Sequence, residues 1–449
     1  MRRCFLVLLS VLSASASSLF KRNALDFEVH PESAWQTDWQ IPFTFSTNFT
    51  NSDYKRMIGD AFRLIEANSC LQFQDASTWN DFEAFFPHSI LTIVNASAMS
   101  CQTDTLGKEL DGQLTLIHLG ELCFTVKTAL FEPFEQSHLQ LDTIIHEIFH
   151  SLGVDHTHSR FDRGEFVTLV ENNTGEWQDQ YSIENSAELT NLGVSYDFDS
   201  IMHYQNTNDE LIARDPLFQQ NLEISNTRVA HSDFLLLNRL YKCFANCSDA
   251  RTLCENGGFV NPHRCTSCIC PRGFSGAFCD LARMAIVGEK RCGGSVYASD
   301  EWKTISRRIA APGECHFHFV VRQLALLLVI RSSFQSSRNK RVEIELLELA
   351  PSDENCTLVN GWVEVRLGRF GYGGYKFLCD ARLPNATLKS VGNRAVVSLQ
   401  AKGPGQSFTL RFRSAMRENE SLPKKITKSG SGLLYSLPAA VLFICVVLL

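Results

Sequence analysis

The sequence predicts an α+β domain, then a small disulfide-rich module and then a β-sandwich. Three observations support this order. The stretch from residue 23 to 243 mixes helical and strand-like patterns and contains four cysteines. Six cysteines crowd between Cys247 and Cys279, a segment too short to build a sizeable apolar core. From Cys292 onward, short apolar or period-two runs alternate with Gly, Pro, Asn and Ser, which is typical of a β-sandwich.

Length and charge narrow the class of protein. At 449 residues the chain exceeds what one hydrophobic core usually organises, so several domains are expected. Its formal charge is −7, and Lys and Arg are spread thinly along it. A protein that binds phosphate backbones needs a clustered basic stripe. The sequence therefore predicts that nucleic acid is not a partner.

The beginning of the chain indicates export. Residues 1–16 have the basic start, apolar run and small residues of a secretory signal peptide, with cleavage expected after Ala16. Sixteen cysteines fit an oxidising compartment, and seven Asn-X-Ser/Thr sequons fit the same route. The predicted glycosylation sites are Asn48, Asn95, Asn172, Asn246, Asn355, Asn385 and Asn419.

The other end of the chain is apolar. Residues 433–449 carry no charge, and they follow three lysines and the small residues 429–432 at the end of a linker that spans 414–432. A membrane span normally keeps its positive charges on the cytoplasmic side, whereas these lysines would lie outside. The tail is therefore better explained by a glycolipid (GPI) anchor signal than by a membrane anchor that spans the bilayer. Both interpretations predict attachment to the extracellular face of the plasma membrane, and without the tail the protein would be secreted.

The chemistry is concentrated in the segment His146-Glu147-X-X-His150-X-X-Gly153-X-X-His156. On a helix, His146 and His150 lie one turn apart on the same face, where two imidazoles can bind one metal ion. Gly153 can adopt a positive φ that ends the helix and turns the chain back, so that His156 supplies a third nitrogen. This pattern predicts one catalytic zinc ion with three histidine ligands.

Glu147 follows a ligand directly and is predicted to be the general base. A carboxylate at this place can reach a water molecule on the metal. Zinc lowers the pKa of such a water and polarises a substrate carbonyl. Glu147 would take the proton and later deliver it to the leaving amine, as in peptide-bond hydrolysis.

The extended histidine motif resembles the signature of the metzincins. The later segment Ser200-Ile-Met202-His-Tyr204 resembles the Met-turn of one metzincin family, the astacins, and the resemblance extends from about Asn23 to Cys243. It implies an astacin-like α+β metzincin domain with two subdomains around a zinc cleft. It further implies that Met202 lies beneath the three histidines, and that Tyr204 binds the metal at rest and hydrogen-bonds the tetrahedral intermediate during catalysis.

The remaining cysteines resemble two extracellular modules. Segment 247–279 resembles an EGF-like module, and segment 292–413 resembles a CUB domain. Spacing alone leaves fifteen connectivities open for six cysteines, so the pairs are those that the resemblances imply. They are Cys70–Cys243 and Cys101–Cys123 in the astacin-like domain, Cys247–Cys265, Cys254–Cys268 and Cys270–Cys279 in the EGF-like module, and Cys292–Cys315 and Cys356–Cys379 in the CUB-like domain.

Two departures from the astacin pattern concern activation. Astacins usually carry Glu directly after the third histidine, where it helps to lock the new amino terminus, whereas this chain has Thr157. A mature protein starting at Asn23, after Lys21-Arg22, leaves residues 17–22 as a very short pro-segment with no aspartate to place on the zinc. The charged cluster at Arg160, Asp162 and Arg163 is interpreted as an internal ion pair.

Together these features predict a secreted or surface-attached zinc endopeptidase that hydrolyses extracellular proteins. The EGF-like and CUB-like modules would bind substrates, matrix or surface proteins. The main alternative is an adhesion protein with an inactive protease-like domain, although no ligand, Glu147 or Tyr204 is lost. A serralysin-like metzincin is a third class, and the many cysteines and added modules weigh against it. Arg214 or Arg228 could supply a cation for an acidic residue after the scissile bond.

Overall fold

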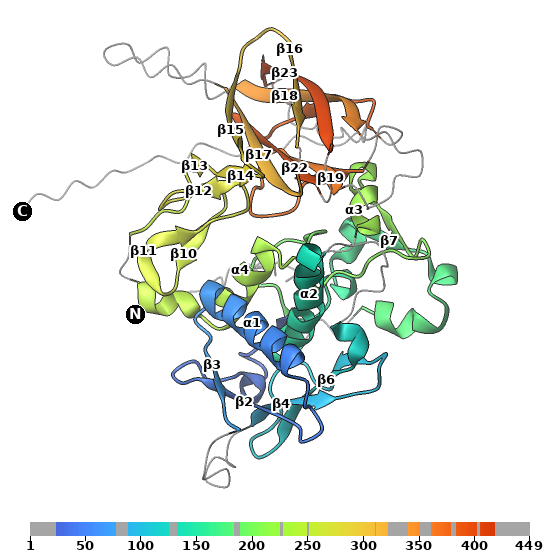
Figure 1. Ribbon diagram of the computed structural model, residues 1–449, viewed down its shortest axis with the longest axis vertical. Helices are drawn as coiled ribbons and strands as arrows, with labels where there is room; N and C mark the ends of the chain where they lie inside the picture. The colour runs from blue at the N-terminus through green and yellow to red at the C-terminus, as the bar shows by residue number, and fades with distance from the viewer. Residues whose placement is uncertain are drawn as a thin grey trace, which may run out of the picture.

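A computed structural model describes residues 24–77, 89–124, 133–183, 189–224, 228–248, 251–309, 311–321, 340–350, 361–378, 383–401 and 405–417. Figure 1 shows a mixed α/β part at the bottom, a β-sandwich at the top and a small strand-rich module on the left between them. The predicted order of an α+β domain, a disulfide-rich module and a β-sandwich is confirmed.

The first half of the α+β domain is a five-stranded sheet with two long helices. The strand order is β3-β2-β4-β6-β5, and only β5 runs antiparallel to its neighbour. Figure 1 shows α1 and α2 side by side above this sheet, and their apolar faces complete its core. The elements are β2 (Ile41–Phe45), α1 (Ser52–Asn68), β3 (Phe73–Asp75), β4 (Ile90–Asn95), β5 (Cys101–Thr103), β6 (Leu114–Leu119) and α2 (Pro133–Ser151).

Helix α1 illustrates how the sequence builds this layer. Asn51 caps its first turn, because the side-chain oxygen accepts hydrogen bonds from the backbone N–H groups of Asp53 and Tyr54. Its apolar residues recur every three or four positions and are buried against the sheet. The buried residues are Met57, Ile58, Ala61, Phe62 and Ile65.

The second half of the domain is more irregular and consists largely of short 3-10 helices and short strands. Strand β1 pairs with β8, and Ala24 also forms a bridge to Val154, so the start of the described chain lies beside the end of the histidine motif. Strand β7 pairs with β9. The elements are β1 (Ala24–Leu25), β7 (Val167–Leu169), β8 (Leu189–Thr190), β9 (Leu211–Ala213), α3 (Gln219–Glu223) and α4 (His231–Leu240).

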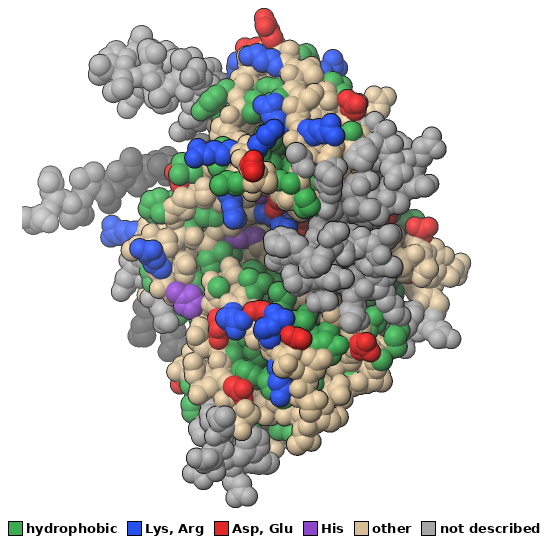
Figure 2. All heavy atoms as spheres, in the orientation of Figure 1, with side chains coloured by type: hydrophobic (Ala, Val, Ile, Leu, Met, Phe, Trp, Pro, Cys, Tyr) green, Lys and Arg blue, Asp and Glu red, His purple; other side chains and the backbone are tan. Residues whose placement is uncertain are grey.

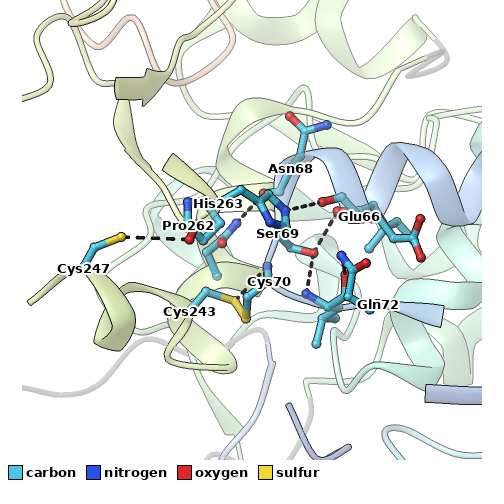
Figure 3. Close-up of a disulfide and its surroundings, with 12 residues drawn as sticks. Glu66, Asn68, Ser69, Cys70, Gln72, Cys243, Cys247, Pro262 and His263 are labelled. Carbon is cyan, nitrogen blue, oxygen red and sulfur yellow. Dashed lines mark hydrogen bonds between the residues drawn. A yellow bond between two sulfur atoms is a disulfide. The ribbon is translucent and has the colours of Figure 1, made fainter. Parts of the chain in front are cut away.

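A long-range disulfide ties the two halves of this domain together. Figure 3 shows Cys70, which follows α1, bonded to Cys243, which follows α4, with a sequence separation of 173 residues. His263 of the module lies nearby, with its Nε2 atom 2.7 Å from the carbonyl oxygen of Glu66. The structure also has the bridges Cys101–Cys123, Cys247–Cys265, Cys254–Cys268, Cys270–Cys279 and Cys292–Cys315. Cys356 and Cys379 lie outside the described residues.

The module and the sandwich are built from strands. The module has two hairpins, β10 (Phe259–Asn261) with β11 (Arg264–Ile269) and β12 (Phe274–Ser275) with β13 (Leu281–Ala282). The sandwich has a six-stranded sheet, β14-β15-β17-β22-β19-β20, and a four-stranded sheet, β16-β23-β18-β21. Their bounds are β14 (Met284–Val287), β15 (Lys290–Ala298), β16 (Lys303–Arg308), β17 (Gly313–Val321), β18 (Lys340–Ala350), β19 (Gly361–Arg366), β20 (Tyr375–Phe377), β21 (Leu388–Lys389), β22 (Arg394–Ala401) and β23 (Ser407–Met416).

Several sequence expectations fall on residues that the structure does not describe: residues 1–22 with the signal and pro-segment, residues 418–449 with the tail, and the sequons at Asn355 and Asn419. The side chains of Asn48, Asn95, Asn172 and Asn385 are exposed. Within the described ranges, none of the helices combines the length and the apolar character needed to cross a bilayer. The face in Figure 2 carries basic and acidic side chains in small groups.

Candidate metal centre

The three histidines of the motif converge on one point. His146 and His150 project from α2, and Gly153 follows that helix with a φ of +87°, as the sequence predicts. The chain then turns back and brings His156 to the same place. The Nε2 atoms are separated by 3.1 Å (His146–His150), 3.2 Å (His146–His156) and 3.1 Å (His150–His156). Within the described ranges, this is the cluster of His, Cys, Asp and Glu side chains whose geometry suits a metal ion.

The hydrogen bonds of His146 and His150 leave the Nε2 lone pairs of these two rings free. The Nδ1 atom of His146 lies 2.9 Å from the carbonyl oxygen of Ile201, and that of His150 lies 2.9 Å from the carbonyl oxygen of Val154. A carbonyl oxygen only accepts, so each Nδ1 carries the proton and each Nε2 presents a lone pair. Burial lowers the pKa of His150 to about 3 and that of His156 well below its usual range.

Neutral nitrogen lone pairs that face one another at such short distances repel, unless a cation lies between them. Three imidazole nitrogens, two of them on rings whose second nitrogen is bonded to a backbone carbonyl, are also the donor set that zinc prefers when one position stays open for water or substrate. The residues present therefore fit one zinc ion.

Glu147 lies beside the histidines and is held by a residue from the sheet. Its side chain is buried, and the hydroxyl of Thr103 in β5 lies 3.0 Å from its Oε2 atom and 2.9 Å from its backbone carbonyl oxygen, so that it can donate to either acceptor. Burial raises the pKa of Glu147, while His146 and the Thr103 hydrogen bond act in the opposite direction. Thr103 carries no motif that would have identified it from the sequence.

The Met-turn lies directly against the histidine cluster. Met202 is fully buried, and its carbonyl oxygen accepts the backbone N–H of Thr157 at 2.9 Å, one residue after the third histidine. The carbonyl of Ile201 in the same turn accepts the ring N–H of His146. The structure thus brings the histidine motif and the Met-turn, which are about 46 residues apart, into a single site.

Tyr204 lies at the edge of this site. Its ring centroid is 4.6 Å from that of His156 and 4.0 Å from that of His158, and its hydroxyl donates to the side-chain oxygen of Gln180 at 3.3 Å. Burial and the charge of Glu147 raise the pKa of Tyr204 to about 12, so its hydroxyl is protonated at neutral pH and can donate. No motif in the sequence identifies His158 or Gln180 as a neighbour of this tyrosine.

Thr157, the residue that departs from the astacin pattern, belongs to a buried hydrogen-bond chain. Its hydroxyl lies 2.9 Å from that of Ser200, which donates at 2.6 Å to Asp233 at the start of α4. Asp233 also accepts the backbone N–H groups of Ile201 and Ala230. Burial raises the pKa of Asp233 to about 7. A hydroxyl and a buried carboxylate thus connect Thr157 with the Met-turn.

The charged residues after the motif have structural partners. Arg160 makes a two-pronged ion pair with Asp162 at 2.7 and 3.0 Å, and both side chains are buried, as the sequence predicts. Arg163, the third residue of that cluster, donates to the backbone carbonyl oxygens of His158 and Tyr181. Arg214 donates to the carbonyl of Gly164. Arg228 pairs with Glu314 of the β-sandwich at 3.0 Å.

The fold and the site define a domain with a mononuclear metal centre of the metzincin kind, in which a helix, a glycine turn and a Met-turn hold three histidines beside a buried glutamate. Residues 27–242 match the family model described as Astacin, which is a peptidase family. This part of the chain belongs to the astacin family.

The curated relatives include zinc metalloproteinases of nematodes. Zinc metalloproteinase nas-27 of Caenorhabditis elegans is 28% identical over 298 residues, which is 60% of this chain and 65% of that protein. Nas-36 of Brugia malayi is 29% identical over 298 residues, which is 64% of this chain and 48% of that protein. This chain therefore spans about half to two thirds of the length of these relatives. Among solved structures, high choriolytic enzyme 1, a hatching enzyme zinc-protease from Oryzias latipes (medaka fish), is 19% identical and aligns with 45% of this chain and 88% of that chain, with a TM-score of 0.33.

Proposed function

We propose that this protein is a zinc endopeptidase that hydrolyses peptide bonds in extracellular proteins, either secreted or attached to the outer surface of the plasma membrane. The observation that carries the proposal is the convergence of the Nε2 atoms of His146, His150 and His156 beside the buried carboxylate of Glu147. The membership of residues 27–242 in a peptidase family supports it.

When bound to the three histidines, zinc supplies Lewis-acid polarisation of the scissile carbonyl and acidifies water. Glu147 takes the proton of the attacking water and transfers it to the leaving amine. Thr103 holds the carboxylate of Glu147 in place through its hydroxyl. Tyr204, whose hydroxyl stays protonated, donates a hydrogen bond to the oxyanion that forms during attack.

The other units of the chain supply binding surfaces in this proposal. The disulfide-rich module and the β-sandwich place the protease on protein substrates or on matrix and surface proteins, and the C-terminal tail attaches it to the membrane. The competing function is an adhesion protein whose protease-like domain is inactive. The intact set of His146, Glu147, His150, His156 and Tyr204 favours the enzyme.

Removal of zinc is expected to abolish peptide cleavage and to destabilise the α+β domain. A peptide library is incubated with the protein starting at Asn23, before and after treatment with a chelator and after zinc is added back. Cleavage should fall to background and return with zinc, and the melting temperature should fall and recover in parallel because a ligand that binds only the folded state stabilises it. If the folded, zinc-loaded protein cuts no peptide, the adhesion function replaces the protease.

Replacement of Thr103 by valine is expected to lower kcat by up to about tenfold at unchanged KM, because the carboxylate of Glu147 loses the hydrogen bond that positions it. Thr103→Ser keeps the hydroxyl and serves as the matched control, which should retain wild-type kcat. Steady-state kinetics on one library-derived peptide measure both constants. A valine variant with wild-type kcat would show that Thr103 does not position the base.

A further inference from the structure

The β-sandwich contacts the segment that leads into the Met-turn. Residues 367–374, between β19 and β20, form the contacting loop, and α3 of the α+β domain lies against β20, near β19 in the view of Figure 1. The backbone N–H of Gly373 donates to Asp197 at 3.0 Å, and Lys376 in β20 pairs with Asp199 at 2.9 Å. The hydroxyl of Tyr372 accepts the backbone N–H of Ser195 at 3.3 Å. Three contacts thus hold residues 195–199, immediately before Ser200.

These contacts are buried and close. Asp197, the partner of Gly373, is 4% exposed, and Lys376 is 3% exposed, while the side chain of Asp199, its partner, is 13% exposed. None of these charges is solvated well by water. A buried carboxylate or ammonium that loses its partner is destabilising, because the remaining charge stays desolvated. At Gly373, an added Cβ would lie 2.3 Å from the carboxyl carbon of Asp199, so only glycine allows this approach.

From Asp197, hydrogen bonds and one step along the chain lead to Thr157, the residue after the third histidine. Asp197 also accepts the hydroxyl of Ser232, which precedes Asp233 at the start of α4. Asp233 accepts the hydroxyl of Ser200, and Ser200 in turn bonds Thr157. Thr157 follows His156 directly. Thr157, which stands in place of the glutamate of the astacin pattern, thus takes part in a network that ends at the β-sandwich.

We propose that the β-sandwich is a positioning element of the metal centre. Lys376 and the backbone of Gly373 hold Asp199 and Asp197, and these residues fix the Met-turn and Thr157 in the arrangement in which His156 binds zinc. The inference rests on the proposed zinc site, although it does not require that the protein cleaves peptides. Lys376 acts through Asp199 and touches no reacting atom, so its role is that of a positioning residue.

Replacement of Lys376 by methionine in the full chain is expected to raise the zinc dissociation constant about tenfold, the lower end of the effect of residues that orient metal ligands. The double variant Asp199→Asn/Lys376→Met also removes the carboxylate charge of Asp199, which Lys376→Met leaves without its partner. Its zinc dissociation constant should return to within about twofold of wild type. The matched control is Tyr375→Phe. It removes a 2.8 Å hydrogen bond to Asp215 in the same interface, away from the Met-turn, and should leave zinc affinity unchanged.

Zinc affinity is measured by competition with a coloured chelator, and the visible spectrum of the cobalt-substituted protein reports the ligand geometry independently. Wild-type zinc affinity and spectrum in Lys376→Met, or an equal loss in Tyr375→Phe, would overturn the inference. If Lys376→Met does not fold, the inference is tested with the double variant and with Tyr372→Phe. Tyr372→Phe is expected to bind zinc twofold to fivefold more weakly than wild type. An unchanged zinc affinity in Tyr372→Phe would count against the inference. A wild type that binds zinc but cuts nothing would contradict the proposed function alone.

Discussion

Replacement of Glu147 by glutamine is expected to reduce kcat about a thousandfold while zinc affinity changes by less than about twofold. Glutamine has nearly the same shape and can still accept the hydrogen bond from Thr103, so the site should keep its structure. It cannot take a proton from water, and loss of a general base typically costs 10²–10⁴ in rate. Cleavage kinetics on a library-derived peptide and zinc competition on the same preparation measure the two quantities.

The matched control for this variant is Glu66→Gln on α1. Glu66 accepts a hydrogen bond from the backbone of Phe73 through Oε1, which a glutamine oxygen also provides, and it lies away from the histidines. Wild-type activity is expected in this control. If Glu147→Gln retained more than about a tenth of the wild-type rate, another group would be the base and the assignment of Glu147 would be wrong.

Removal of the Cys70–Cys243 bridge is expected to lower the free energy of unfolding of the α+β domain by about 5 kcal/mol. The bridge closes a loop with a sequence separation of 173 residues, and the loss of loop-closure entropy in the unfolded chain grows with loop length. Its removal also frees the end of α1 from the segment after α4 (Figure 3). Denaturant titration of Cys70→Ala/Cys243→Ala measures the loss of unfolding free energy. Hydrogen exchange of the α1 amides in the same variant reports whether this helix opens more readily.

The shorter bridge Cys101–Cys123 provides the comparison. Its separation is 22 residues, and the same entropy argument gives about 3 kcal/mol. The long-range double variant should therefore be the less stable of the two by about 2 kcal/mol. The reverse order would mean that native packing around β5, and not loop length, determines what each bridge contributes.

The metal ligands could be predicted because their geometry is local. A spacing of four places His146 and His150 on one helical face, and Gly153 provides the turn that brings back His156, so no tertiary contact had to be known. The same reasoning could not find Thr103 or Asp233, because their contacts with Glu147 and Ser200 join residues that are 44 and 33 positions apart in the chain. Contacts between elements that are distant in the chain produce no periodic pattern in the sequence.

The β-sandwich shows a second limit of prediction from the sequence. Period-two alternation correctly predicts strands in this region, but it predicts that alternate side chains face water. In β19 all six residues are buried, including Glu364 and Arg366. The outer face of this strand is covered by another part of the chain, since Arg272 of the disulfide-rich module bonds Glu364 and its carbonyl accepts from Arg366. A strand pattern read from the sequence cannot reveal that a neighbouring module covers it.

The contact between the α+β domain and β20 also bears on solubility. Strand β20 is the last strand of its sheet, and its outer backbone groups bond side-chain amides: Asn221 donates to the carbonyl of Gly374 and accepts from the N–H of Lys376, while Gln220 accepts from the N–H of Leu378. An uncovered edge strand is a template for pairing with another chain. A β-sandwich expressed without the α+β domain would expose this edge, and it is expected to self-associate through β20.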